Sequence, residues 1–254
     1  MTKKIFSLPS IEVKKITKSP LVTKFIIQHL TPRLAIALGN TFRQLLMTQV
    51  PGWGIFAVRF ASKDKETGKI KVAASEWEVL QGSKILPSEI IFPLQELVFK
   101  DKGNLDKNQI HTLKINVDNS HGKQAYQVTG KDIQGVLEVI NPEVYLTTLE
   151  AGAQLKIDLY CRYHWDSVSD KEQKSLLKEK ERENVIFLPT DYCPVKTVSL
   201  KTADVGSGKK EEPLELVITT DGSISGSDSM LVIGKFLEQI MLEIQQKVAS
   251  SAEK

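Results

Sequence analysis

The feature that most constrains this chain is an amphipathic segment near its C-terminal end, residues 228–248. Five apolar residues recur there at alternating steps of three and four: Met230, Ile233, Leu237, Ile240 and Ile244. This spacing predicts an α-helix with a narrow apolar seam, of the kind that packs against another helix. Other apolar residues broaden the surface beyond what one sheet face requires: Leu231, Phe236, Met241 and Val248. A core helix and a helix shared with a subunit interface fit this pattern equally well.

A second helical period lies near the N-terminal end, at residues 35–49. Its apolar residues fall at helical spacings and form one face: Ala35, Leu38, Phe42, Leu45 and Leu46. Asn40, Arg43 and Gln44 lie together on the other side. Pro51-Gly52 is expected to end this helix.

Outside these two helices the chain favours β-structure. Strands are expected at residues 21–30, 55–60, 112–117, 125–128, 136–140, 155–163, 185–188, 195–200 and 214–220. The clearest is 155–163, where apolar and polar residues alternate as in a strand with one face in water. No internal repeat is visible.

Three shorter segments carry weaker signals. Residues 1–20 are rich in lysine and contain two prolines, which favours an irregular arm. Ser88 is placed to cap a short helix that Pro93 would end. Residues 170–183 are almost all charged, which indicates an exposed helix or a mobile loop.

Composition excludes several classes of protein. The chain has 254 residues, of which 41% are hydrophobic and 26% charged, as in ordinary globular domains. Its net charge of +3 is too small to mark a nucleic-acid binder. There is no apolar run of membrane-spanning length and no signal peptide, so a reducing, cytosol-like compartment without membrane contact is expected.

No local motif indicates catalysis, a cofactor or a metal. Cys161 and Cys193 are too far apart for a metal-binding or redox pair motif, and the four histidines are scattered. The glycine-rich loop at 206–210 lacks the hydroxyl residue of a phosphate-binding loop. No catalytic, cofactor or metal residue is therefore predicted. An enzyme built from dispersed acid–base residues remains the weaker alternative.

Four segments, taken in order, resemble a known family. Residues 38–48 (LGNTFRQLLMT), followed by Pro51-Gly52, resemble the first-helix motif of the RNA polymerase alpha subunits of bacteria and plastids. Residues 140–149, 191–195 and 214–224 resemble three later motifs of that family. Together they span about residues 20–248, and their order makes the resemblance specific.

The resemblance implies an α+β fold with two domains. Residues 1–54 and 186–254 would form a discontinuous dimerisation domain, and residues 55–185 an inserted, mainly β domain. This agrees with helices at the two ends of the chain and short strands between them. The family's C-terminal DNA-binding domain is expected to be absent, so no sequence-specific DNA contact is expected.

The resemblance also implies a role in assembly. Alpha subunits form homodimers, on which the beta and beta-prime subunits of RNA polymerase assemble, so a non-catalytic subunit of a transcription enzyme is expected. Its location would be the bacterial cytoplasm or the plastid stroma. The alternative is a divergent interaction scaffold that works outside a polymerase.

Two sets of site residues follow from the resemblance. The implied dimer interface comprises Leu34, Leu38, Phe42, Ile233, Leu237, Ile240 and Ile244. The implied contacts with the large subunits are Gly39, Asn40, Arg43, Gln44, Asp191, Pro194 and Val195. Arg43 matches the first arginine of a family pair, whereas Gln44 replaces the second. That replacement removes a planar guanidinium donor for carboxylates.

Overall fold

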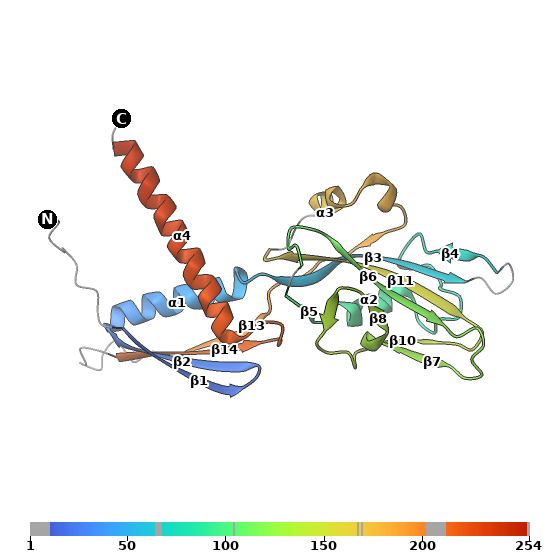
Figure 1. Ribbon diagram of the computed structural model, residues 1–254, viewed down its shortest axis with the longest axis horizontal. Helices are drawn as coiled ribbons and strands as arrows, with labels where there is room; N and C mark the ends of the chain where they lie inside the picture. Colours follow the sequence, from blue (N-terminus) through green and yellow to red (C-terminus); the bar gives the residue numbers. More distant parts are fainter. Residues whose placement is uncertain are drawn as a thin grey trace. The chain divides into compact units, whose positions relative to one another are not determined.

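Two compact units make up the computed structural model (Figure 1). It describes residues 11–63, 68–103, 105–166, 168, 170–201 and 212–252. Unit 1 combines the two ends of the chain, Met1–Val50 and Cys193–Lys254. Unit 2 is the continuous segment Pro51–Tyr192. With its helices and antiparallel sheets the chain is α+β, as predicted.

Unit 1 is built on a four-stranded antiparallel sheet in the order β1-β2-β14-β13. Its strands are β1 (Glu12–Ser19), β2 (Val22–Leu30), β13 (Val195–Lys201) and β14 (Glu212–Thr220). The central pair joins the two ends of the chain, with Phe25 opposite Leu216. A cross-strand ion pair, Lys24 Nζ to Glu215 Oε2 at 2.9 Å, links the same two strands. The sheet therefore holds the two halves of unit 1 together.

Two helices, α1 (Pro32–Thr48) and α4 (Gly226–Ala252), lie over one face of this sheet (Figure 1). Proline at the first position suits the start of α1, because that position needs no N–H donor. Ser225 caps α4, its Oγ accepting the Asp228 N–H at 3.1 Å. The core beneath the helices is apolar and includes Phe25, Leu30, Leu46, Leu216 and Ile233.

Unit 2 is mostly β-structure. Its strands are β3 (Gly52–Lys63), β4 (Ile70–Val72), β5 (Phe99–Asp101), β6 (His111–Asp118), β7 (Tyr126–Thr129), β8 (Ile133–Gln134), β9 (Leu137–Val139), β10 (Tyr145–Leu149), β11 (Gln154–His164) and β12 (Ile186–Phe187). Eight of them form one sheet in the order β8-β6-β11-β3-β5-β9, with β4 and β12 also paired to β3, while β7 and β10 form a separate two-stranded antiparallel sheet. The helical segments are α2 (Pro87–Gln95), α3 (Asp170–Leu176) and the 3₁₀ turns η1 (Gly130–Asp132) and η2 (Glu179–Glu181).

The central strand β11 was predicted to have one buried apolar face and one face in water. The buried face is confirmed, whereas the prediction for the other face is wrong in part. Leu155, Leu159 and Cys161 are buried in the main core of unit 2. The opposite face is not simply wet, because Tyr160 is buried in a second, smaller core with Tyr192 and others. Segments beyond β11 supply part of that core, which the strand's own pattern could not indicate.

Two local predictions are wrong. Residues 12–19, expected within an irregular arm, form the edge strand β1, because they pair with β2. The short helix α2 begins at Pro87 after an N-cap at Leu86, rather than being capped by Ser88. It also continues past Pro93 to Gln95. Bonds of 3₁₀ type, such as Glu96 N–H to Pro93 O at 3.2 Å, close its last turn.

The expected domain boundaries differ from those of the units by a few residues. Gly52 opens β3, and β12 at Ile186–Phe187 pairs with β3. Both segments therefore belong to unit 2, so the units change after Val50 and after Tyr192.

Candidate functional site

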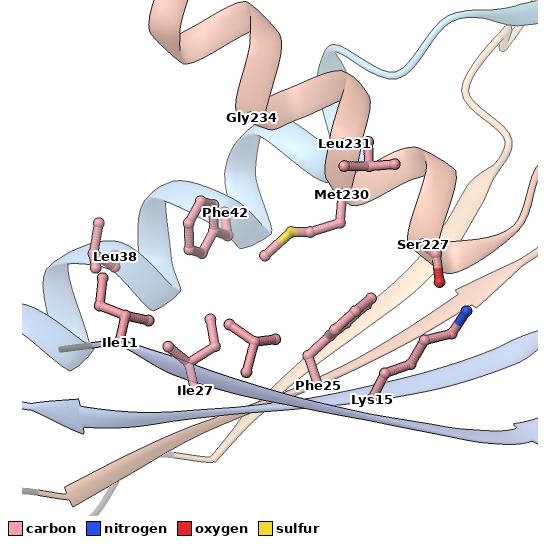
Figure 2. A pocket seen from close by; sticks show the side chains of 11 residues that line it. Ile11, Lys15, Phe25, Ile27, Leu38, Phe42, Ser227, Met230, Leu231 and Gly234 are labelled. Carbon is pink, nitrogen blue, oxygen red and sulfur yellow. The ribbon is translucent and has the colours of Figure 1, made fainter.

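An apolar groove of about 490 Å³ lies in unit 1 between its two helices and the β1–β2 hairpin (Figure 2). Eleven residues line it: Ile11, Val13, Lys15, Phe25, Ile27, Leu38, Phe42, Ser227, Met230, Leu231 and Gly234. Soluble proteins rarely expose a continuous apolar surface unless it binds a partner. The groove is therefore the candidate site of this chain.

The strand register creates the floor of the groove. Val13 pairs with Ile27 and Lys15 pairs with Phe25, so these four side chains share one face of the β1–β2 hairpin. In Figure 2 the side chains of Lys15, Phe25 and Ile27 rise toward the helices. The aliphatic stem of a lysine can lie along apolar neighbours while its ammonium stays in water, which suits the exposed Lys15.

The helices supply the walls. Leu38 and Phe42 are one turn apart on α1 and pack partly against the core of unit 1. Met230, Leu231 and Gly234 come from α4 (Figure 2). Leu231 is 62% exposed, so the wall continues onto an open apolar surface.

One hydroxyl in the groove stands out. The Oγ of Ser227 is buried but has no hydrogen-bond partner among the described residues. A buried polar atom without a hydrogen bond is unfavourable. Serine keeps this cost small, because its side chain carries only one polar atom.

The predicted dimer residues have three different environments. Ile233 is fully buried in the core of unit 1, so its assignment to an intersubunit surface is corrected. Leu38, Phe42 and Leu237 are partly buried against that core. The remaining three are half-buried or exposed: Leu34, Ile240 and Ile244. Leu38 and Phe42 on α1 and the later part of α4 thus remain available for contact with a second subunit.

The predicted large-subunit contacts also divide. Asn40, Arg43 and Gln44 are exposed on α1. Gly39 is buried, and a Cβ at this position would lie 2.9 Å from Cδ1 of Leu214. Its role is therefore to let α1 pack closely against the sheet.

The remaining three predicted contacts lie in the 191–195 segment. Pro194 and Val195 are buried in unit 1, Val195 within its core, so neither offers a free surface. Asp191 is exposed and belongs to unit 2. Pro194 and Val195 therefore belong to the packed interior of unit 1 rather than to a contact surface.

Several groove residues were missed from the sequence. The floor residues Ile11, Val13 and Lys15 come from the segment that was expected to be irregular. The signal for a strand was the alternation of Ile11 and Val13 with charged neighbours, but Lys15 on the same face interrupted it. Gly234 and Ser227 fell outside the apolar seam because they are small.

The described part of the chain contains His, Cys, Asp and Glu side chains, which are the usual protein ligands of metal ions. No group of three or more His, Cys, Asp or Glu residues there could hold a metal ion. Both cysteines are buried, and burial raises the pKa of the Cys161 thiol. Of the helices that the structure describes, none has the length and apolarity to cross a membrane.

Comparisons with known proteins point in one direction. No model of a protein family matches the chain. Three similar proteins, each named DNA-directed RNA polymerase subunit alpha, come from Malacoplasma penetrans, Prosthecochloris aestuarii and Borreliella burgdorferi. They are 25%, 26% and 26% identical to this chain, over 84%, 90% and 99% of its length.

The chain matches only part of each relative. It spans 63% and 65% of the first two, less than two thirds of their length, and 72% of the third. The resemblance found in the sequence motifs is confirmed: the chain is homologous, over most of its length, to the N-terminal region of bacterial RNA polymerase alpha subunits.

Proposed function

We propose that this chain is an assembly subunit of a multisubunit, DNA-directed RNA polymerase. The similarity to alpha subunits over 84–99% of the chain carries the proposal. In this role the chain has no active site of its own. It forms a homodimer through unit 1 and presents that dimer to the beta and beta-prime subunits, in the bacterial cytoplasm or the plastid stroma.

The exposed apolar surface of unit 1 supports dimerisation. Along the later turns of α4, Met241, Ile244 and Val248 are 54%, 49% and 63% exposed. Obligate dimers bury surfaces that resemble a protein core, and such residues are costly to leave in water. The proposed interface comprises Leu34, Leu38, Phe42, Leu237, Ile240 and Ile244, together with the groove.

The exposed polar side of α1 supports the second part of the proposal. Asn40, Arg43 and Gln44 have the donors to bind carboxylates and carbonyl groups on a large subunit. Arg43 contributes a guanidinium that can bind a carboxylate through two parallel hydrogen bonds. Asp191 is a further contact on unit 2. Gly39, Pro194 and Val195 support the packing of this region and do not themselves bind.

Co-expression of the tagged chain with the beta and beta-prime subunits of its own source tests the proposal. We expect all three to co-purify. Arg43→Ala should reduce recovery of a large subunit about tenfold, since a hydrogen bond to a charged group contributes about 1.5 kcal/mol. Lys114→Ala, at an exposed position on β6 of unit 2, is the matched control and should bind normally.

Two outcomes would each count against one part of the proposal, the first against the role in a polymerase and the second against the contact by Arg43. Recovery of a dimer that retains neither large subunit would point to a scaffold outside a polymerase. Equal binding by Arg43→Ala and Lys114→Ala would remove Arg43 from the contact, even with the complex intact.

A further inference from the structure

The four-stranded sheet of unit 1 has two faces, and the two helices described in this unit lie over one of them (Figure 1). Side chains alternate between the faces of a strand, so Phe25 and Ile27, buried beneath the helices, leave Lys24 and Ile26 on the opposite side. Six residues define this opposite side, which we call the outer face: Lys14, Ile16, Lys24, Ile26, Val217 and Lys201.

The strand order places apolar residues at the centre of the outer face and lysines at its sides. Ile26 and Val217 belong to the central strands β2 and β14, and both are half-buried. Lys14 and Lys201 belong to the edge strands β1 and β13, and both are exposed. Ile16, also on β1, is 45% exposed. An apolar centre inside a polar rim is the usual anatomy of a protein–protein interface.

One carboxylate lies among these lysines. Glu215 is opposite Lys201 in the register, and its Oε2 accepts a hydrogen bond from Lys24 Nζ at 2.9 Å. This bond and the positive charges of Lys24, Lys201 and Lys18 lower the pKa of Glu215. The lysines of this side outnumber its glutamates, so the outer face carries a net positive charge.

Three kinds of occupant differ in how well they fit the outer face. A second copy of the chain would bring lysines against lysines across a two-fold axis, which is unfavourable. A nucleic-acid backbone would neutralise the lysines but would leave Ile16, Ile26 and Val217 without apolar contacts. A protein segment with an apolar stripe between acidic residues matches both the centre and the rim.

We infer that the outer face binds an acidic amphipathic segment of another protein. The apolar stripe of that segment lies on Ile16, Ile26 and Val217. Its carboxylates reach Lys14 on one side and Lys201 on the other. This binding goes beyond the proposed polymerase role, because the groove and the polar side of α1 belong to the helix-covered side of the sheet.

The test measures the binding of labelled peptides to the full chain by fluorescence anisotropy. The probe is a helical peptide of about five turns, or about 18 residues, with leucines along one side and glutamates beside them. In one companion peptide lysine replaces glutamate, and in the other serine replaces leucine. We expect only the acidic amphipathic peptide to bind, and more weakly as the salt concentration rises from about 0.05 M to about 0.5 M.

Charge variants locate the bound peptide. Lys14→Glu should raise the Kd of the acidic peptide about threefold to tenfold, because repulsion replaces attraction. Lys114→Glu makes the same charge change at an exposed position on β6 of unit 2, so it is the matched control and should leave the Kd unchanged. If Lys14→Glu does not fold, Lys201→Ala tests the other edge of the face and should raise the Kd about twofold to fivefold.

An apolar variant tests the centre of the face. Ile16→Ser should also raise the Kd about threefold to tenfold, because it removes apolar surface from the interface. Ile70→Ser is the matched control, since Ile70 is an isoleucine with 54% exposure on β4 of unit 2. An unchanged Kd in both Lys14→Glu and Ile16→Ser would place the peptide elsewhere, for instance in the groove, and would overturn the inference.

The remaining outcomes also decide the matter. Failure of the acidic peptide to bind would overturn the inference. A labelled DNA duplex of about 20 base pairs that binds more tightly than the peptide, and responds to Lys14→Glu but not to Ile16→Ser, would assign the face to nucleic acid instead. Co-purification with the beta and beta-prime subunits tests the polymerase role separately, so loss of peptide binding alone would leave that role standing.

Discussion

At the scale of single residues, Asp118 makes the stability of the fold depend on pH. It ends β6 and accepts hydrogen bonds from Ser120, through the side chain and through the backbone N–H at 2.9 Å, and from Gln154 Nε2 at 2.7 Å. These bonds favour the charged carboxylate and lower the pKa of Asp118 from 3.8 to about 2. A folded-state pKa below the unfolded one stabilises the fold above about pH 4, and this contribution is lost as the pH falls toward 2.

Asp118→Asn should therefore remove part of the acid sensitivity. We expect the urea midpoint of the unchanged chain to fall more steeply between pH 4 and pH 2 than that of the variant, because only the unchanged chain must take up a proton at this site. Parallel profiles for the two proteins would assign the acid response to other carboxylates.

The local sequence predicted which residues of α1 are exposed, but it did not predict which motif residues are buried. The exposed positions Asn40, Arg43 and Gln44 followed from the helical period of α1 alone. Gly39 belongs to the same motif, yet it is buried, because its neighbours Leu200 and Leu214 come from strands far along the chain. A local motif marks such a position but does not reveal whether packing or binding requires it.

At the scale of elements, α4 serves two environments. Ile233, in its first part, is fully buried in the core of unit 1, whereas Ile244, three turns later, is 49% exposed. Both belong to the same apolar seam in the sequence. Periodicity predicts which face of a helix is apolar, but the length of the sheet beneath it decides where burial within the copy ends.

Alanine substitutions at these two positions should therefore act differently. Ile233→Ala should lower the free energy of unfolding of the monomer by about 2–5 kcal/mol, because it leaves a cavity in the core. Ile244→Ala should change monomer stability by less than about 0.5 kcal/mol but weaken the dimer. Denaturation at a chain concentration below the dimer dissociation constant measures the stability of the monomer, and sedimentation measures the strength of the dimer. An equal loss of monomer stability would place Ile244 in the core.

Among the strands, too, the local sequence predicted one element and missed another. The alternation in residues 155–163 predicted β11 and its buried face, because that signal lies within the strand itself. The edge strand β1 was missed, since its residues are exposed and charged and its hydrogen bonds come from pairing with β2. Edge strands depend on their neighbour more than on their own hydrophobicity.

At the scale of the whole molecule, the chain leaves unit 1 after Val50 and returns at Cys193. Both residues are buried in the core of unit 1, and the Sγ of Cys193 lies 3.5 Å from the carbonyl oxygen of Leu46. The point of departure and the point of return are thus close together. The discontinuous arrangement was expected from the resemblance, whereas the pairing of β2 with β14 gives its physical basis.

Because the chain leaves and re-enters unit 1 at neighbouring points, we expect each unit to fold without the other. Replacing residues 51–192 by a short Gly-Ser linker should leave unit 1 folded and dimeric, because closing a short loop between adjacent ends costs little entropy. Residues 51–192 alone, with a core of their own, should unfold cooperatively and remain monomeric. Circular dichroism during heating and light scattering after gel filtration measure both properties. A monomeric, folded unit 1 would show that unit 2 contributes to the dimer, and an unfolded one would show that the four-stranded sheet needs the inserted segment.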